Sequence, residues 1–414
     1  MIEGKLIKFH REGLGLTQGQ LAQGICSVTH ISKIERSITE YSNEITDLLA
    51  KKLGITMAIE RSRYYSLQEK LSKWNNAIIM IHSKEIHQLK EEIEKEPLRF
   101  LADFNIQYHL LLARYYLFVN KKPKTKEVLE RIKKQYSFLT PYEKNHLRHV
   151  DGIYLFLTGN FKSCIERLKQ IDSDYPNEEY YYHLALAYHS MHSNIFAYFY
   201  GQKALQFFQS TLNILRIIDA ETLLLVQLNS KEPHDMEETR KEYEKLLKVC
   251  ESVNSADRAS KIYHNLAFEY YRRKRYSEAK HSYEKAFELI SEEASHYTLS
   301  LDGYISACYK GKLLSEAELI KLSKKGLKIT KQNQDPKQMD FEIQLHTIYQ
   351  NEKELYEYIE KTVLPILIAN GDQFIKQHYE KKLFLYYVKT NQKEKAFKLA
   401  SDKMINEKSY YDFE

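Results

Sequence analysis

Apolar and polar positions over residues 16–36 follow the period of two short helices joined by a turn. Thr17 with Gln20 makes a Thr-x-x-Gln capping box, which predicts that the first helix begins there. Ser27 is placed to cap the second helix. The positions on the inward face of both helices are apolar: Leu21, Ala22, Ile25, Ile31 and Ile34. The segment is therefore predicted to be a helix-turn-helix.

The outward positions at the start of the second helix carry small or hydrogen-bonding side chains. Such a face suits the major groove of DNA, where base edges offer donors, acceptors and methyl groups. The residues on this face are Val28, Thr29, His30, Ser32 and Lys33. The alternative is an ordinary pair of surface helices. We expect a DNA-binding head.

Beyond residue 60, glycines and prolines are few and no alternating strand pattern appears. In residues 259–290, two predicted helices place small and large apolar residues at the spacing of a tetratricopeptide repeat, whose small residues let antiparallel helices approach closely. These residues are Leu266, Ala267, Tyr270, Ala279, Tyr283 and Ala286. Weaker copies flank this segment. We expect about seven to nine helical pairs in a right-handed solenoid with a concave inner face.

The predicted fold class is therefore all-α, with a helix-turn-helix domain followed by a tetratricopeptide-repeat solenoid. The helix-turn-helix domain is expected over residues 1–57 and a linker helix over residues 58–75. Residues 76–414 are expected to form the repeat domain, which binds a peptide and forms the oligomer.

A solenoid of this kind presents the inner helix of each pair to an extended peptide. In the clearest repeat, an asparagine amide can pair with both the N–H and the C=O of a peptide backbone. An arginine in an earlier repeat could hold a carboxylate bidentately. The alternative is that Asn265 and Arg114 only satisfy neighbouring repeats. The peptide-binding candidates are Arg114, Tyr182, His189, His264, Asn265, Phe268 and Tyr271.

The formal net charge of the 414 residues is +6, but little of it lies in the head. Over residues 1–57, seven Lys and Arg oppose six Asp and Glu. Affinity from phosphate neutralisation should therefore be modest for one head. A dimer that reads two half-sites would compensate, so the weak charge favours a homodimer or higher oligomer.

Cysteine usage and hydropathy indicate a soluble cytoplasmic protein. The four cysteines form no C-x-x-C pair and are expected to be reduced core residues. Charges begin at Glu3, so no secretory signal is expected. The longest apolar runs, such as Leu223 to Val226, are too short to span a membrane.

No motif of a nucleotide-binding loop, a hydrolase or a zinc protease occurs in the sequence. Histidine pairs such as His146 with His149, or His189 with His192, lack a carboxylate or cysteine at ligand spacing. We therefore expect no metal, no cofactor and no catalytic residue, and predict that the protein is not an enzyme.

The first 57 residues resemble the Xre-type, λ-repressor-like helix-turn-helix. The resemblance implies that Gln18 and Arg36 anchor phosphates while the start of the second helix, including Ser27, meets bases. His10 departs from the core leucine that is usual there. Gly13 and Gly15 are expected to loosen the first turn, because glycine in a helix costs about 1 kcal/mol relative to alanine. The matching residues are Lys8, Phe9, Arg11, Leu16–Gln18, Leu21, Ala22, Ile31, Ser32, Ile34–Arg36 and Leu53–Ile55.

This head on a long solenoid resembles the peptide-pheromone receptors of the Rap–Rgg–NprR–PlcR–PrgX group, and its length is most similar to the NprR branch. The resemblance implies a transcriptional regulator whose binding to a double-stranded DNA operator is set by a short signalling peptide, as in quorum sensing. Two alternatives stay open. One is a prophage regulator controlled by a protein partner. The other is a Rap-like binder or phosphatase of a phosphorelay response regulator, with Gln88 and Gln107 as candidate polar residues.

Overall fold

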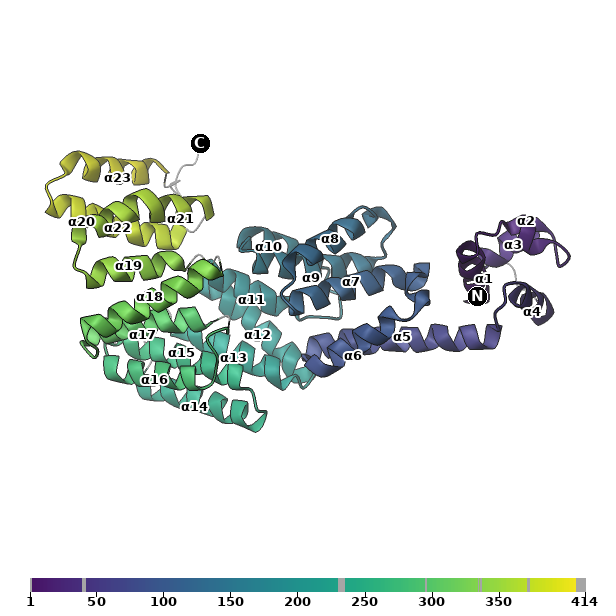
Figure 1. The fold of residues 1–414 in the computed structure, drawn as a ribbon, viewed down its shortest axis with the longest axis horizontal. Helices are drawn as coiled ribbons and strands as arrows, with labels where there is room; N and C mark the ends of the chain where they lie inside the picture. The colour runs from purple at the N-terminus through teal and green to yellow at the C-terminus, as the bar shows by residue number, and fades with distance from the viewer. Residues whose placement is uncertain are drawn as a thin grey trace. The chain divides into compact units, whose positions relative to one another are not determined.

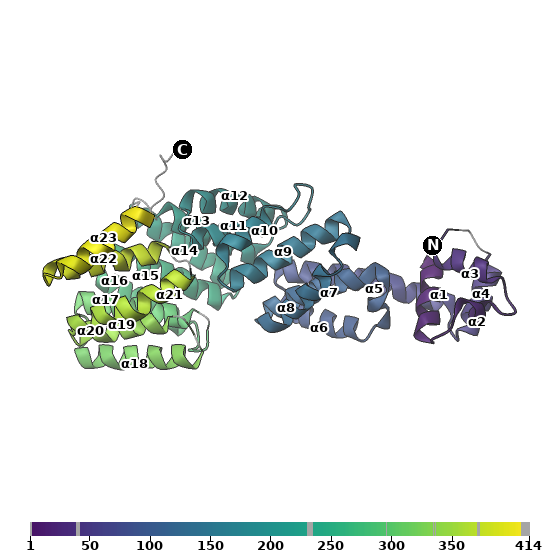
Figure 2. The same cartoon turned by 90° about the horizontal axis from the view of Figure 1, so that it is seen from above.

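The computed structural model describes residues 2–38, 42–229, 235–294, 296–333, 335, 337–370 and 373–406. Every regular element within these residues is helical (Figures 1 and 2). The chain divides into two compact units, Met1–Tyr180 and Tyr181–Glu414, which are described separately here. The predicted all-α class, with a helix-turn-helix followed by a helical-repeat solenoid, is confirmed.

The head consists of α1 (Ile2–Gly13), α2 (Gln18–Ala22), α3 (Val28–Glu35) and α4 (Asn43–Lys52). Both predicted N-caps are present: the Thr17 hydroxyl accepts from the Gln20 N–H at 3.1 Å, and the Ser27 hydroxyl accepts from the His30 N–H at 3.2 Å. These caps satisfy backbone N–H groups that a helix start leaves unpaired. The head core includes Leu6, Ile7, Leu21, Ile31, Ile34 and Leu49.

Two glycines of the head have different reasons to be there. A Cβ on Gly4 would lie 2.0 Å from the carbonyl oxygen of Ile34, so glycine lets α1 and α3 approach closely. Gly15 has φ +69°, a left-handed conformation that side chains other than glycine disfavour. The expectation that Gly15 loosens a helix is therefore wrong, because it lies beyond the end of α1 and suits the turn there.

Helical hairpins follow the head in the first unit. Residues 58–75, predicted as the linker and first solenoid helix, lie within α5, which continues to Met80 and packs on α6. The elements are α5 (Met57–Met80), α6 (Ser83–Glu94), η1 (Pro97–Phe100), α7 (Ala102–Phe118), α8 (Lys122–Lys133), η2 (Tyr136–Phe138), α9 (Pro141–Leu157) and α10 (Phe161–Leu168).

The second unit continues with helical hairpins. They are α11 (Tyr180–Ser190, whose first residue belongs to the first unit), α12 (Asn194–Ser210), α13 (Ile214–Leu228), α14 (Met236–Ser252), α15 (Ala256–Arg272), α16 (Tyr276–Glu288), α17 (Tyr297–Gly311), α18 (Glu316–Gln332), α19 (Gln338–Ile348), α20 (Glu352–Tyr358), η3 (Ile359–Val363), α21 (Leu364–Asn370), α22 (Gln373–Lys389) and α23 (Lys393–Asn406). The segment η3 is a π-helical turn just before Pro365, which lacks the N–H that a regular α-helix needs.

Small residues at the helix crossings hold these hairpins together. All six residues that predicted the repeat over 259–290 are buried, from 0% exposed at Ala267 to 7% at Tyr270. Glycines serve the same purpose elsewhere: a Cβ on Gly326 would lie 2.2 Å from the ring of Phe341. Since no larger side chain fits these contacts without a shift, the spacing of small residues dictates which helices pair.

Candidate functional site

The start of α3 is an exposed polar face, as the sequence predicted. Val28 is 51% exposed. Ser27, Thr29, Lys33 and Arg36 are exposed, and Gln18, His30 and Ser32 are half-buried. Ile31 and Ile34 on the opposite side are fully buried. The structure therefore brings the predicted DNA-contacting residues together on one side of the head.

A buried ion pair between Arg11 on α1 and Glu35 on α3 fixes the recognition helix to the rest of the head. Arg11 donates to both carboxylate oxygens of Glu35, at 2.5 and 2.9 Å, and to the carbonyl of Leu16 at 2.7 Å. The hydrogen bonds that Arg11 donates to Glu35 raise the pKa of Arg11. Gln18 also donates to Glu35, at 2.8 Å, so its amide is held against the ion pair. The family resemblance includes Arg11, but no spacing in the sequence predicts its pairing with Glu35, which is 24 residues away.

In the second unit, some of the predicted peptide-binding residues of α15 are accessible, whereas others are bonded to neighbouring helices. Phe268 is 47% exposed, and its ring stacks on that of Tyr271 with centroids 6.5 Å apart. Asn265 is half-buried, and its amide forms no hydrogen bond with any other residue that the structure describes. Asn265, Phe268 and Tyr271 follow each other at intervals of three residues, so they lie along one side of the helix.

Three other predicted residues of this unit already have internal partners. The Nδ1 atom of His264 lies 3.0 Å from the Ser300 hydroxyl, and burial lowers the pKa of His264 to about 4. His189 Nδ1 lies 2.9 Å from the Gln227 amide. Tyr182 is buried. These side chains connect neighbouring helices and are less available to a ligand than Asn265.

Arg114 in the first unit is not the free ligand-binding arginine that we expected. Its Nη2 donates to Oε2 of Glu179 at 2.6 Å, and the two side chains are 5% and 0% exposed. The carboxylate that Arg114 holds therefore comes from its own chain. The contact agrees with the other possibility raised from the sequence, in which Arg114 only bonds a neighbouring repeat.

Two carboxyl groups of the second unit, Asp302 and Asp340, have raised pKa values that no sequence pattern reveals. Asp302 on α17 accepts a 2.5 Å hydrogen bond from Gln344 on α19. Burial, with the nearby charge of Asp340, raises the pKa of Asp302 to about 7. Burial also raises the pKa of Asp340. Only the fold brings these side chains together, since Asp302 and Gln344 are 42 residues apart.

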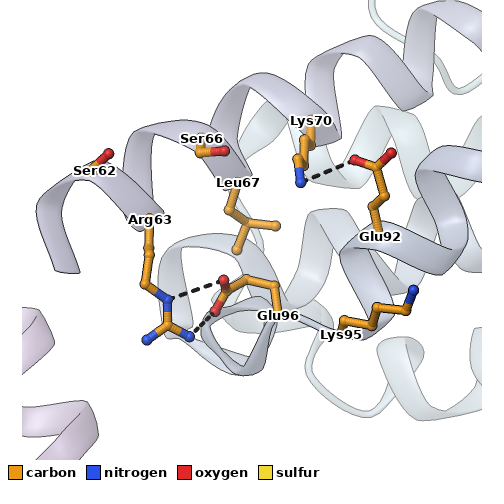
Figure 3. A pocket seen from close by; sticks show the side chains of 8 residues that line it. All are labelled: Ser62, Arg63, Ser66, Leu67, Lys70, Glu92, Lys95 and Glu96. Carbon is orange, nitrogen blue, oxygen red and sulfur yellow. Dashed lines mark hydrogen bonds and ion pairs between the residues drawn. The ribbon is translucent and has the colours of Figure 1, made fainter. Parts of the chain in front are cut away.

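A cavity of about 430 Å³ opens between α5 and α6 in the first unit (Figure 3). Its charged side chains are largely paired, since Arg63 donates to Glu96 at 2.7 Å and Lys70 lies 3.0 Å from Glu92. Two of the three cations in the lining, Arg63 and Lys70, are therefore neutralised by its two carboxylates. The Gln88 amide donates to Glu92 at 3.0 Å, and Gln107 is half-buried on α7.

Within the described ranges, no group of three His, Cys, Asp or Glu side chains is arranged to hold a metal ion. Among the same residues, none of the helices has the length and apolar character needed to cross a membrane.

Comparisons with known proteins find relatives of the head and of the whole chain. The helix-turn-helix family matches residues 7–59. The transcriptional activator NprA of Geobacillus stearothermophilus is 24% identical over 411 residues, which cover 92% of this chain and 96% of NprA.

Solved structures share the fold. NprR in complex with its cognate peptide NprX matches 82% of this chain and 99% of its own, with a TM-score of 0.65 and 22% identity. A Rap protein complexed with competence and sporulation factor matches 81% of this chain and 99% of its own, with a TM-score of 0.63 and 19% identity. The chain thus carries an Xre-type helix-turn-helix domain and a repeat domain with the fold of the NprR and Rap peptide receptors.

Proposed function

We propose that the protein is a transcriptional regulator that binds operator DNA through α3 and is controlled by a short peptide bound in its repeat domain. The observation that carries the proposal is the presence of two partly exposed surfaces on one chain, each with the chemistry to bind a partner. One is the polar face of α3, and the other is the side of α15 that carries Asn265, Phe268 and Tyr271. The similarity to an activator along nearly the whole chain supports the same reading.

The α15 surface has the chemistry that an extended peptide requires. The amide of Asn265 can donate to a peptide carbonyl and accept from a peptide N–H at the same time. The exposed ring of Phe268 offers apolar area to a side chain.

We further propose that the chain acts by binding, without catalysis, as a homo-oligomer in the cytoplasm. The relative along nearly the whole chain is named as an activator, which supports a binding role. Two heads on one oligomer would also compensate for the modest charge of each head, since affinity from linked sites exceeds that of either alone.

A peptide screen tests the control mechanism. Short peptides encoded beside the gene are added to the full-length protein, and binding is followed by calorimetry. We expect one peptide to bind the wild-type protein and to bind Asn265→Ala at least about fivefold more weakly, since losing both hydrogen bonds of the amide costs about 1–3 kcal/mol. Lys245→Ala, which changes an exposed side chain of α14 bonded to Glu242, is the matched control. Equal affinity for Asn265→Ala and the wild type would remove α15 from the peptide site.

A further inference from the structure

The carboxylate of Asp103, in the repeat domain, links α1 of the head with α5 and α7. Both carboxylate oxygens of Asp103 accept from the Lys5 ammonium, at 2.9 and 2.7 Å. The Tyr64 hydroxyl donates to the same carboxylate at 2.7 Å. Lys5 lies on α1 in the head, Tyr64 on α5 and Asp103 in the first turn of α7. Burial and this hydrogen bond raise the pKa of Tyr64, which keeps the phenol protonated as a donor.

A second polar cluster ties the same region together. His10 Nε2 on α1 lies 2.7 Å from Oε2 of Glu60 on α5. The other oxygen of Glu60 accepts from Arg63 at 2.7 Å, and Arg63 also donates to both oxygens of Glu96 (Figure 3). Glu96 directly precedes η1, and Asp103 follows it. Both ends of the connection between α6 and α7 are therefore bonded to α5.

Apolar contacts make this connection firm. Leu98 is 0% and Leu101 5% exposed, so the short segment between the two carboxylates is anchored in the core. The ring of Tyr64 packs on that of Phe104, with centroids 4.6 Å apart. An isolated surface ion pair contributes little, but here two hydrogen-bonded clusters act on one anchored segment. No residue of α3 takes part in either cluster, so its exposed face stays available.

We propose that Asp103 is a positioning residue for DNA binding, which fixes the orientation of the head on α5 and the start of α7. A displacement of the first turn of α7 would then turn the recognition helix with it, although the two are far apart in sequence. The consequence for DNA rests on the proposed function, whereas the docking of the head does not.

Distance measurement by pulsed electron spin resonance on the full-length chain tests the docking without DNA or peptide. Labels are placed at Gln23→Cys in the head and Lys126→Cys on α8, both exposed, with Cys26 changed to serine. The other three cysteines are buried and stay unlabelled. The variants are Asp103→Ala, Tyr64→Phe and the charge exchange Lys5→Asp with Asp103→Lys. Glu69→Ala, which breaks an ion pair with Lys73 inside α5, is the control.

The proposal predicts a narrow distance distribution in the wild type and in Glu69→Ala. Asp103→Ala should broaden it at least twofold, Tyr64→Phe should broaden it less, and the charge exchange should restore most of the narrow width. A wild-type distribution as broad as that of Asp103→Ala would overturn the proposal. So would an unchanged narrow distribution in Asp103→Ala. A failure of DNA binding with narrow distributions would instead count against the proposed function.

Discussion

Replacing Arg114 by alanine removes the cationic half of a buried ion pair. The Arg114 Nη2 and the Glu179 Oε2 are 2.6 Å apart, and neither side chain is more than 5% exposed. Breaking such a pair from one side costs about 3–5 kcal/mol, because the remaining charge stays buried without its counter-charge. For a unit of this size each kcal/mol lowers the melting temperature by about 2–4 °C, so the first unit should melt roughly 6–20 °C lower.

Thermal unfolding of the full-length chain, followed by circular dichroism, measures this effect. Arg131→Ala is the matched control in the same unit, because its ion pair with Glu127 is exposed at 57% and 72%. An exposed pair of this kind is worth about 0.3–0.5 kcal/mol, so the control should melt within about 2 °C of the wild type. The double variant Arg114→Met with Glu179→Leu should recover most of the loss, since it removes both charges.

Two outcomes would refute this reasoning. If Arg114→Ala melted within 2 °C of the wild type, the buried pair would not be formed in solution. If the double variant were less stable than Arg114→Ala, the loss would come from packing and not from an unpaired charge.

Three further predictions concern the groove, the head and the repeat packing. The carboxyl of Asp302 ionises near pH 4 in the unfolded chain, whereas the fold raises its pKa to about 7. The free energy of unfolding should therefore fall as the pH rises from about 4 to 7, because the unfolded chain releases this proton more readily. Urea unfolding at several pH values should show this decrease, and Asp302→Asn should show less of it. Thr29→Ala should reduce sequence preference more than total affinity, whereas Lys33→Ala should weaken all DNA binding and lower the salt slope by about one, as binding titrations at several salt concentrations would show. Equal behaviour of the two variants would contradict the assigned recognition face. Gly326→Ala should cost about 1–3 kcal/mol because its Cβ meets a phenylalanine ring at 2.2 Å, whereas Gly13→Ala enters open space; denaturant titration should separate the two.

Features with a local cause could be predicted from the sequence. The cap at Thr17 depends on a residue three positions away, and the inward face of α3 depends on a period of three to four residues. The small residues of α15 and α16 predicted a tight hairpin for the same reason, and they are buried as expected.

Pairings between distant residues could not be predicted in this way. Arg114 pairs with Glu179, which is 65 residues away in the sequence. His10, at a position where the resemblance implies a core leucine, pairs with Glu60, which is 50 residues away. Spacing within a helix shows which side a polar residue faces. It does not show whether another helix brings a partner to that side. The sequence around Arg114 therefore does not reveal Glu179, and the sequence around Asp302 does not reveal Gln344.

The central claim is that a peptide in the repeat domain controls DNA binding by α3. Selection of DNA from a random-sequence pool by the full-length protein, with and without the peptide that calorimetry identifies, tests it most directly. The account predicts enrichment of one sequence motif, lost in Thr29→Ala. It also predicts a peptide effect on the affinity for that motif, lost in Asn265→Ala. Absence of any enriched motif under both conditions, or a motif bound equally with and without peptide, would contradict the account.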